Sequence, residues 1–349
     1  CAKPFQTVIS DINPSYDSDQ VPGSYFNSFT GDMSGLNVST LGQTIWTNES
    51  GGSAMHYIGQ SGLIYDGSPK PKSVSSFGNI RGLAPEEPTK NGSYYSAAVA
   101  YYGAKTDINS VAGSQKVQTF AVALASPLPR IEIPVASGKR VTLVPFAKSV
   151  GGFGINASSG SFQPTNQIVD FYVESIAADG RSGSFRVNFE DVEQGADHDM
   201  DAIALYQFQV NGDDTVTVTM NSQYAAGGII QHMGYVISGT TGDGTYLEVR
   251  DLDTAAGADV QYFLDTPPGQ PPGGNWNDGQ PLPLTASRTF IPGSSDGATI
   301  LKDPLWYAAK WGGFQDSNNN NLPDVKKEYD SNGPDGLGDN VPDNYFLVT

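Results

Sequence analysis

Several segments in the middle of the chain alternate apolar and polar residues, and this alternation constrains the fold more than any other feature. The pattern extends over residues 185–190, 206–210 and 216–220. Successive side chains of a β-strand point to opposite faces, so each segment is expected to bury one face. The turn residues 211–214 join the last two segments into a β-hairpin. We therefore predict an antiparallel β-domain over 128–264, most closely a sandwich.

The first third of the chain has a different pattern, in which apolar runs are separated by a helical segment. The runs at 4–10 and 115–126 predict buried strands, and the Ala-rich segment 94–102 predicts a short helix. A strand, a helix and a second strand in this order are typical of an α/β sheet. Residues from about 14 to 90 are rich in Ser, Thr and Gly, and we predict a long, weakly structured insertion there.

These patterns divide the chain into four parts, and the predicted fold class is mixed α/β and mainly β. Residues 1–127 form part of an α/β domain that carries the insertion at about 14–90, and residues 128–264 form the β-domain. Residues 265–300 are rich in Pro and Gly, which predicts a linker or a strap. Residues 301–349 contain a well-capped helix and an acidic loop.

The composition excludes several classes of function. Nineteen Lys and Arg against 37 Asp and Glu give a formal charge of −18, which argues against a nucleic-acid partner. The single cysteine, Cys1, excludes an internal disulfide and a thiolate zinc cluster. No apolar run approaches the ~20 residues of a membrane span. Nine of the 37 acidic residues are Glu, leaving 28 Asp, the residue that suits turns and calcium loops.

The first candidate site directly follows the helix predicted at 303–312. Oxygen-bearing side chains recur there at every second residue, followed by a backbone ligand at the seventh position, as in an EF-hand-like calcium loop. The predicted ligands are Asp316, Asn318, Asn320, the Leu322 carbonyl, Asp324 and Glu328. Lys327 stands at the twelfth position, where Glu is usual, so we expect Glu328 to supply the closing carboxylate. The alternative is an Asn-rich turn that binds no ion.

A second acidic run follows within a few residues. Its candidate ligands are Asp330, Asn332, Asp335, Asp339 and Asp343. The segment 339–343 repeats the pattern of 320–324, with Gly and Pro insertions between the two. Carboxylates this close repel one another unless a cation joins them, so we expect the second run to bind the same ion or a near neighbour.

Two other acidic groups are candidates for cation binding. Asp197, Asp199 and Asp201 alternate with other residues, which places all three on one face of a strand. They could form a metal site, but we favour the interpretation that they lie on a solvated strand edge. Asp11 ends the N-terminal strand, at the edge where open α/β sheets bind ligands, and otherwise caps a turn. The chain has no nucleophile elbow and no phosphate-binding loop, and we predict that it is not an enzyme.

Five segments resemble the PilY1/PilC family of type IV pilus-associated proteins. They are SDINPSYDSDQ (10–20), GADHDMDA (195–202), YAAGGIIQHMGY (224–235), LKDPLWYAAK (301–310) and VPDNYF (341–346). The resemblance implies a von Willebrand factor A-like domain, a central region and a C-terminal calcium-binding β-propeller. This chain then holds the later half of the A-like domain and the central region, without the propeller. Asp11 becomes a candidate ligand of an adhesion site whose DxSxS half is absent.

The resemblance also implies a function and a location. It indicates a secreted, non-enzymatic protein at the pilus tip or outer cell surface of a bacterium, acting in pilus assembly, surface adhesion and twitching motility. Minor pilins or the pilus tip would be its partners, together with an unidentified host or surface ligand. The alternative is an extracellular carbohydrate-binding or other surface binding module, which exposed aromatics in a groove of the β-domain would favour. We expect upstream sequence or another chain to cover the half sheet, because an unfinished α/β sheet exposes an apolar face.

Overall fold

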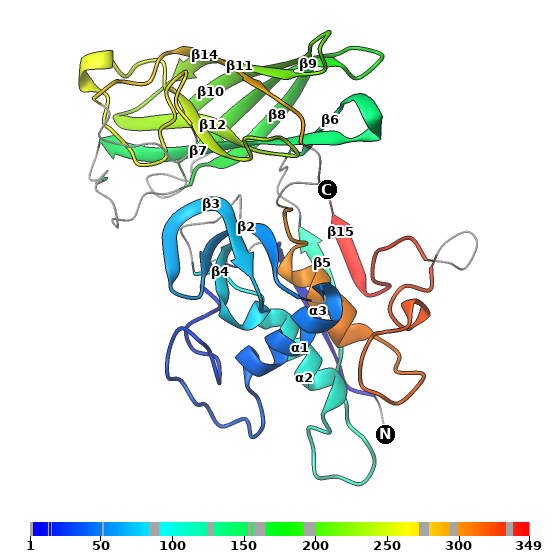
Figure 1. Cartoon of the computed structure of the whole chain (residues 1–349). Helices are drawn as coiled ribbons and strands as arrows, with labels where there is room; N and C mark the ends of the chain where they lie inside the picture. The colour runs from blue at the N-terminus through cyan, green and yellow to red at the C-terminus, as the bar shows by residue number, and fades with distance from the viewer. Residues whose placement is uncertain are drawn as a thin grey trace.

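The protein consists of two bodies, one above the other in Figure 1. The computed structural model describes residues 3–12, 14, 16–50, 52–83, 91–124, 129–152, 155, 165–191, 200–271, 279–293, 299–332 and 338–348. The upper body is a β-sandwich, built from described residues of 129–293. The lower one, which we call the α/β body, combines described residues of 3–124 with those of 299–348. The sandwich is therefore inserted between two segments of the α/β body.

The sandwich contains two antiparallel sheets, as the alternating segments predict. One sheet has the order β14-β11-β10-β9-β8, and the other has the order β13-β12-β7-β6. Their strands are β6 (Ile131–Pro134), β7 (Arg140–Gly152), β8 (Gln167–Ile176), β9 (Ser182–Glu190), β10 (Ala202–Val210), β11 (Val216–Ala225), β12 (Ile229–Ser238), β13 (Gly244–Arg250) and β14 (Thr285–Phe290). Phe185 of β9 lies opposite Tyr206 of β10, and both side chains are buried in the core between the sheets. The predicted fold class, mixed α/β with a β-sandwich, is confirmed.

Strand β14 extends the sandwich beyond the residues that the sequence assigns to it. It lies within 265–300, a segment predicted to be only a linker or strap, and pairs with β11 so that Phe290 faces Val216. Ala286 and Phe290 both reach the core. Buried residues of this six-residue strand alternate with more exposed ones, as expected of a strand on the surface of a sandwich. The surrounding Pro and Gly residues obscure the pattern in the sequence.

The chain between β13 and β14 forms a strap between the two bodies, which we define as residues 251–271 and 279–284. Tyr262 of the strap is buried in one apolar cluster with Tyr57 of the α/β body and Val236 of β12. Burial of such a cluster stabilises the contact between the bodies, since it removes apolar surface from water.

A parallel sheet forms the centre of the α/β body. Its order is β1-β5-β15, where β1 is Phe5–Asp11, β5 is Gln118–Leu124 and β15 is Tyr345–Val348. Helices α2 (Tyr95–Lys105) and α3 (Pro304–Gly313) pack against one face of it. The last described strand of the chain thus returns to the sheet that the first one begins, although the sequence suggests a separate segment at 301–349.

The sequence predicts that β1 and β5 are buried strands, and this prediction is wrong for one face of the sheet. Residues of β5 alternate between buried and partly exposed, and most of β1 is exposed. The reason is that α2 and α3 cover only one face of the sheet among the described residues, whereas parallel sheets in soluble proteins are normally covered on both.

The region from about 14 to 90 is more ordered than its composition indicates. It contains helix α1 (Val38–Ser50) and an antiparallel sheet of order β3-β2-β4, formed by β2 (Ala54–Ser61), β3 (Ile64–Val74) and β4 (Ile80–Leu83). The expectation of weak structure is therefore wrong. Val38, Leu41 and Ile45 recur at helical spacing and are buried, but the Thr, Ser and Gln residues between them mask the period.

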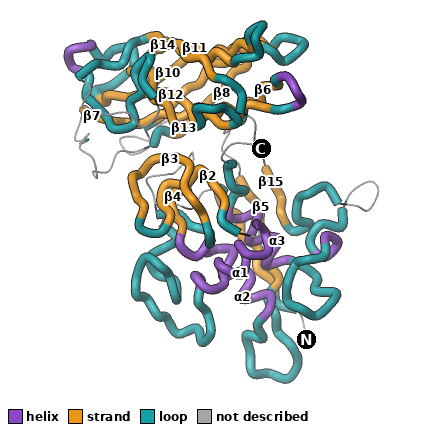
Figure 2. The backbone as a smooth tube through the Cα atoms, viewed as in Figure 1, coloured by secondary structure: helices purple, strands orange, loops and turns teal. Residues whose placement is uncertain are grey.

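Helix α3 begins as its sequence predicts. The Asp303 carboxylate accepts a hydrogen bond from the Trp306 amide at 2.8 Å, and Pro304 occupies the first turn. The helix ends at Gly313, one residue beyond the predicted Gly312. Long loops follow α3 and also precede α1, as Figure 2 shows. None of the helices in the described part of the chain has the length and apolar character needed to cross a bilayer.

Candidate functional site

The loop after α3 brings together the oxygen-bearing side chains that the sequence predicts. The Asp324 carboxylate accepts hydrogen bonds from the side-chain amides of Asn318, at 3.0 Å, and Asn320, at 2.7 Å. The Asp316 carboxylate accepts the backbone amides of Asn320 at 3.1 Å and Asn321 at 3.0 Å. The loop is tightly wound and lies at the protein surface.

Two asparagines give this loop its shape. Asn319 has φ of 63° and Asn321 has φ of 60°, in the left-handed region that Asn tolerates better than most residues. The Asn321 carbonyl accepts a hydrogen bond from the Tyr101 hydroxyl at 3.0 Å, and its side-chain oxygen accepts one from Lys116 at 3.0 Å. Contacts with α2 and with Lys116, two residues before β5, therefore hold the loop in place.

Glu328 closes the loop through the backbone. Its carboxylate is buried and accepts hydrogen bonds from the Ser317 amide at 2.8 Å and the Ser317 hydroxyl at 2.6 Å. A further bond comes from the Val325 amide at 3.3 Å. Glu328 thus binds the residue after Asp316 rather than standing free as a ligand.

The second acidic run forms a separate hydrogen-bond network. The buried Asp330 carboxylate accepts the amides of Asp339 at 2.9 Å and Asn340 at 2.7 Å, with the Lys326 ammonium 3.6 Å away. The Asp343 carboxylate accepts the amide of Ser331 at 3.1 Å and that of Asn332 at 3.2 Å. These carboxylates join the described residues on the two sides of 333–337 to one another. Asp335 lies outside the described residues.

The donor set of the first loop fits calcium by ligand type. Asp316, Asn318, Asn320 and Asp324 supply only oxygen ligands, which suit a hard cation, and the Leu322 carbonyl is the predicted backbone ligand. The described part of the chain contains no cluster of three or more Asp, Glu, His or Cys placed to hold a metal ion. Binding in this loop would therefore depend on the two asparagines as well as on the two aspartates.

Of the remaining predicted acidic residues, the two that the structure describes, Asp11 and Asp201, lie in different bodies. Asp11 is exposed at the carboxyl end of β1, in register with Leu124. Asp201 accepts the Asp191 amide at 2.8 Å, which ties the start of β10 to the end of β9. Asp197 and Asp199 lie outside the described residues.

Sequence reasoning missed Asp17, a carboxylate near the start of α2. One of its oxygens accepts the Ser93 amide at 2.6 Å, and the other has no hydrogen-bond partner. Burial raises the pKa of Asp17 to about 6, and the hydrogen bonds with Ser93 offset part of that effect. The only signal in the sequence that could have identified Asp17 as a candidate is that it follows the strand that ends in Asp11.

A buried ion cluster was also missed. His232 of β12 lies between two strap carboxylates, with Nδ1 2.6 Å from Asp265 and Nε2 2.7 Å from Asp259. Burial alone would lower the pKa of His232, but the two carboxylates outweigh that effect and raise the pKa to about 10. The sequence has neither an HxH nor an HExxH pattern, so nothing local identifies this contact between residues far apart in the chain.

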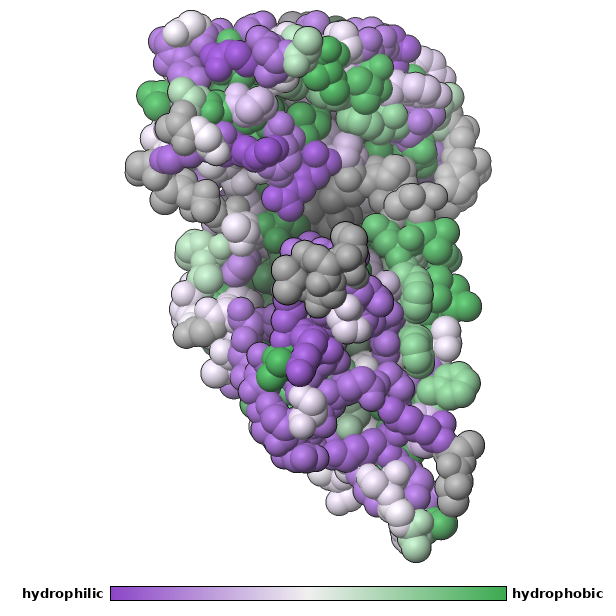
Figure 3. Space-filling model, turned by 90° about the vertical axis from the view of Figure 1, so that its right-hand side faces the viewer, coloured by the Kyte–Doolittle hydropathy of each residue, from purple (hydrophilic) through white to green (hydrophobic). Residues whose placement is uncertain are grey.

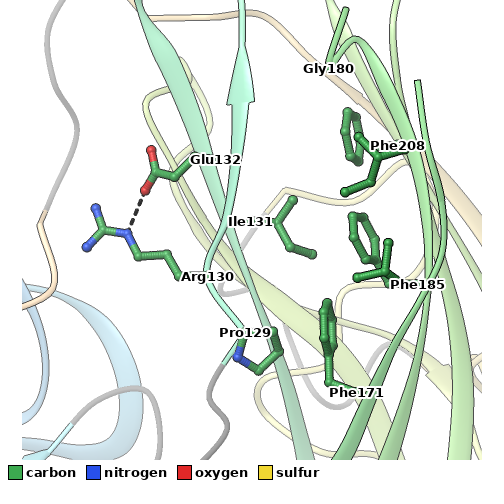
Figure 4. Close-up of a pocket in the computed structure, with 10 residues that line it drawn as sticks. Pro129, Arg130, Ile131, Glu132, Phe171, Gly180, Phe185 and Phe208 are labelled. Atoms are coloured by element: carbon green, nitrogen blue, oxygen red, sulfur yellow. Dashed lines mark hydrogen bonds and ion pairs between the residues drawn. The ribbon is translucent and has the colours of Figure 1, made fainter. Parts of the chain in front are cut away.

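The sandwich has an apolar pocket of about 380 Å³ between the edge strands β6 and β8. Ile131 lines one side, and Phe171, Phe185 and Phe208 line the other (Figure 4). The rings of Phe171 and Phe185 stack at 5.3 Å, and Phe208 stacks on Phe185 at 6.0 Å. An ion pair between Arg130 and Glu132 lies at the rim. Since Phe185 and Phe208 are core residues, the pocket offers no exposed aromatic platform of the kind that binds sugars.

Comparisons with known proteins assign this architecture to a class of pilus-associated proteins. The family model described as the β-sandwich of PilY1 homologues matches residues 133–285, and the one described as their second domain matches residues 1–103. A relative from Xylella fastidiosa (strain Temecula1), named type IV pilus biogenesis factor PilY1 homolog, is 51% identical over 350 residues. No solved structure matches the chain.

The chain therefore carries two domains of the PilY1 family, and the resemblance found in the sequence is confirmed. The alignment covers 89% of this chain but only 23% of the Xylella relative. The chain thus spans less than a quarter of that protein. The β-sandwich match begins inside the predicted β-domain of 128–264 and continues beyond it to residue 285, the first residue of β14.

Proposed function

We propose that this chain is a non-enzymatic segment of a secreted pilus-associated protein that acts in pilus assembly, surface adhesion and twitching motility. The observation that carries the proposal is the 51% identity, over 89% of this chain, to a protein named as a type IV pilus biogenesis factor. The protein is located at the pilus tip or on the outer cell surface of a bacterium, where minor pilins are its partners.

The architecture supports a scaffolding role. The strap, Tyr57 and the sandwich share one buried cluster, and the Tyr57 hydroxyl donates to the Ile237 carbonyl of β12. Buried contacts of this kind restrict the motion of the two bodies against each other, because parting them would expose apolar surface to water. A stiff connection suits a component that holds other parts of a filament at a fixed distance.

Calcium has a structural role in this proposal. The ion neutralises the two carboxylates of the first loop and orders the chain after α3. Its ligands are Asp316, Asn318, Asn320, the Leu322 carbonyl and Asp324. A site with a dissociation constant of ~10⁻⁴–10⁻³ M would remain loaded at extracellular calcium concentrations. The hydrogen bonds of Glu328 and Asp330 keep the flanking backbone in place for it.

The sandwich pocket does not favour the alternative of a carbohydrate-binding module. Sugar-binding platforms present an aromatic face to solvent, whereas Phe185 is 3% exposed and Phe208 is 7% exposed. Tyr172 and Tyr224 are exposed, at 53% and 43%, but neither lines this pocket.

The proposal is tested in the bacterium that encodes this chain. We expect an in-frame deletion of the gene to abolish surface pili and twitching, and the wild-type gene supplied in trans to restore both. A gene carrying Leu63→Ser should restore them equally well, since Leu63 is 90% exposed at a turn. Normal pili and twitching in the deletion strain would contradict the proposal.

A further inference from the structure

We propose that β6 of the sandwich is a dimerisation edge, at which two copies of this chain pair their β6 strands antiparallel about a twofold axis through Ile131. The occupant of this edge is therefore a second copy of the same chain. The inference rests on the backbone geometry and the charges of β6, and it is independent of the proposed function.

The other three edges of the sandwich sheets are poorly suited to pairing. β13 and β14 contact each other at one side of the sandwich, where Arg288 of β14 forms an ion pair with Glu248 of β13 at 2.8 Å. β8 pairs only with β9 among the described strands, but the register between them shifts twice. The charged residues of β8, Asp170 and Glu174, are both acidic. Irregular edges and like charges both oppose the addition of a strand.

β6 presents a regular free edge. Among the described strands it pairs only with β7, in unbroken register. The Val135 amide donates to the Lys139 carbonyl just before β7. Backbone groups alternate in direction along a strand, so those of Ile131 point to β7 as well. The amides and carbonyls of Glu132 and of Arg130, the residue just before β6, therefore point outward, where no described strand meets them.

Pro134 limits the length of this edge without blocking it. By the same alternation its missing amide would point outward, which is where an edge strand tolerates proline. Pro129 precedes the segment, so residues 130–133 are available for pairing. With Ile131 opposite its own copy, Arg130 and Glu132 of different chains become directly opposed. Each such pair exchanges both of its backbone hydrogen bonds, because the groups of both residues point outward.

The charges of this segment are self-complementary. The pairing places Arg130 of one copy opposite Glu132 of the other, and the reverse pair follows from the twofold symmetry. Opposite charges at directly opposed positions stabilise a strand pair. A fitting strand must therefore read base, apolar residue, acid, and residues 130–132 themselves do so. Within one chain Arg130 and Glu132 are 2.6 Å apart, and the Thr142 hydroxyl donates to the Glu132 carboxylate at 3.2 Å, which holds it in place.

The apolar pocket beside β6 adds a hydrophobic contribution. Ile131 points into it toward three phenylalanine rings, whereas Arg130 and Glu132 point away (Figure 4). Val173 and Ile176 also line the pocket, and each is 55% exposed. Figure 3 faces the side on which β6 is labelled in Figure 1, and hydrophobic residues gather there on the upper body. A second copy at this edge brings two pockets together and removes apolar surface from water in both chains.

The oligomeric state of the full-length protein tests the inference. We expect sedimentation velocity between ~1 and ~300 μM to show a reversible monomer–dimer equilibrium with a dissociation constant of ~10⁻⁶–10⁻⁴ M, since a short strand pair buries less area than a standard interface. Arg130→Glu and Glu132→Arg should each raise this constant at least ~10-fold, because like charges then face each other across the axis.

An equimolar mixture of the two variants is the decisive measurement. One variant is acidic at both positions and the other is basic at both, so a heterodimer has opposite charges at each opposed pair. We expect it to form with about the wild-type affinity, and the double variant to dimerise like the wild type. Arg186→Glu is the matched control, because it reverses an exposed arginine that pairs with Glu174 away from β6; it should leave dimerisation unchanged.

Circular dichroism verifies that the variants fold, and Glu132→Lys replaces Glu132→Arg if the latter does not. Dimers in the mixture, at a concentration where each variant alone is monomeric, support the inference. A wild type that stays monomeric at every concentration would overturn it. A dissociation constant unchanged by both substitutions would also overturn it, because the interface would then lie elsewhere. Failure of the mixture to dimerise would show that β6 does not pair with a copy of itself.

Discussion

The Glu49 carboxylate of α1 accepts a hydrogen bond from the Trp311 indole of α3 at 2.6 Å. These residues are 262 positions apart in the chain, so the contact ties the region once expected to be weakly structured to the C-terminal helix. The same oxygen also lies 2.8 Å from the Lys310 ammonium. Glu49 thus stabilises the α/β body at the point where its early and late segments meet.

Substitution of Glu49 by Ala should lower the free energy of unfolding by about 2–3 kcal/mol, because it leaves a buried ammonium and an indole without their acceptor. Urea denaturation measures the change. Lys310→Met in the same background is the matched control, since it removes the unpaired charge and should recover part of the loss. Additive effects of the two substitutions would contradict the coupling.

Replacement of His232 by Gln should destabilise the protein by about 3–5 kcal/mol at pH 6, since it leaves two buried carboxylates facing each other without a cation. Because the pKa of His232 is raised to about 10 in the folded state, from an ordinary 6.5, its contribution is complete below pH 6.5. That contribution is lost as the pH rises through 10.

Denaturation of the wild type and the variant at several pH values between 6 and 10 tests this behaviour. The difference between them should shrink as the pH rises. His56→Gln is the control, because burial lowers the pKa of His56, which is the opposite direction to the shift of His232. A difference for His232→Gln that is constant over the whole range would show that the histidine is neutral.

Asp17 should make the protein less stable as the pH rises from 4 to 7. Its pKa of about 6 in the folded state is above the ordinary 3.8, so the folded state binds the proton more tightly. Ionisation then costs about 3 kcal/mol. Asp17→Asn and Asp17→Ala should both remove this part of the pH dependence, but only Ala should also destabilise the protein at pH 4, since Asn still accepts the Ser93 amide. Equal pH dependence in Asp17→Asn and the wild type would refute the prediction.

Calcium should raise the melting temperature, because an ion that binds only the folded state stabilises it by mass action. At saturation we expect the free energy of unfolding to increase by about 1–3 kcal/mol. A chelator should reverse the shift and expose residues 313–340 to proteases. Asp316→Ala should abolish the response, whereas Asp32→Ala, which changes an exposed aspartate elsewhere, should preserve it. Identical melting and proteolysis with and without chelator would mean that the loop is an Asn-rich turn.

The sequence predicts best where local pattern and packing agree. The strand pair that contains Phe185 and Tyr206 is specified by alternation, and Asp303 and Pro304 specify the start of α3. Prediction was poorer where the decisive partner is distant in the chain. β15 completes a sheet begun by β1, and nothing near Phe346 indicates this pairing.

The candidate sites follow the same division. The side chains of Asp316 and Asp324 could be assigned to one loop, because their spacing alone brings both near Asn320. The orientation of Glu328 toward Ser317 could not be predicted, since it depends on how the chain turns back toward Ser317 after Val325. The cluster around His232 depends on the course of the strap across the sandwich, which no local pattern encodes.

The position of the sandwich between β5 and β15 has a mechanical consequence. β1 begins at one end of the parallel sheet and β15 finishes at the other, and each is paired to β5. Tension between these two ends would shear the strands lengthwise and load many ladder hydrogen bonds at once. The sandwich lies outside that load path, so a pulling force would have to rupture the three-stranded sheet before it reached the sandwich.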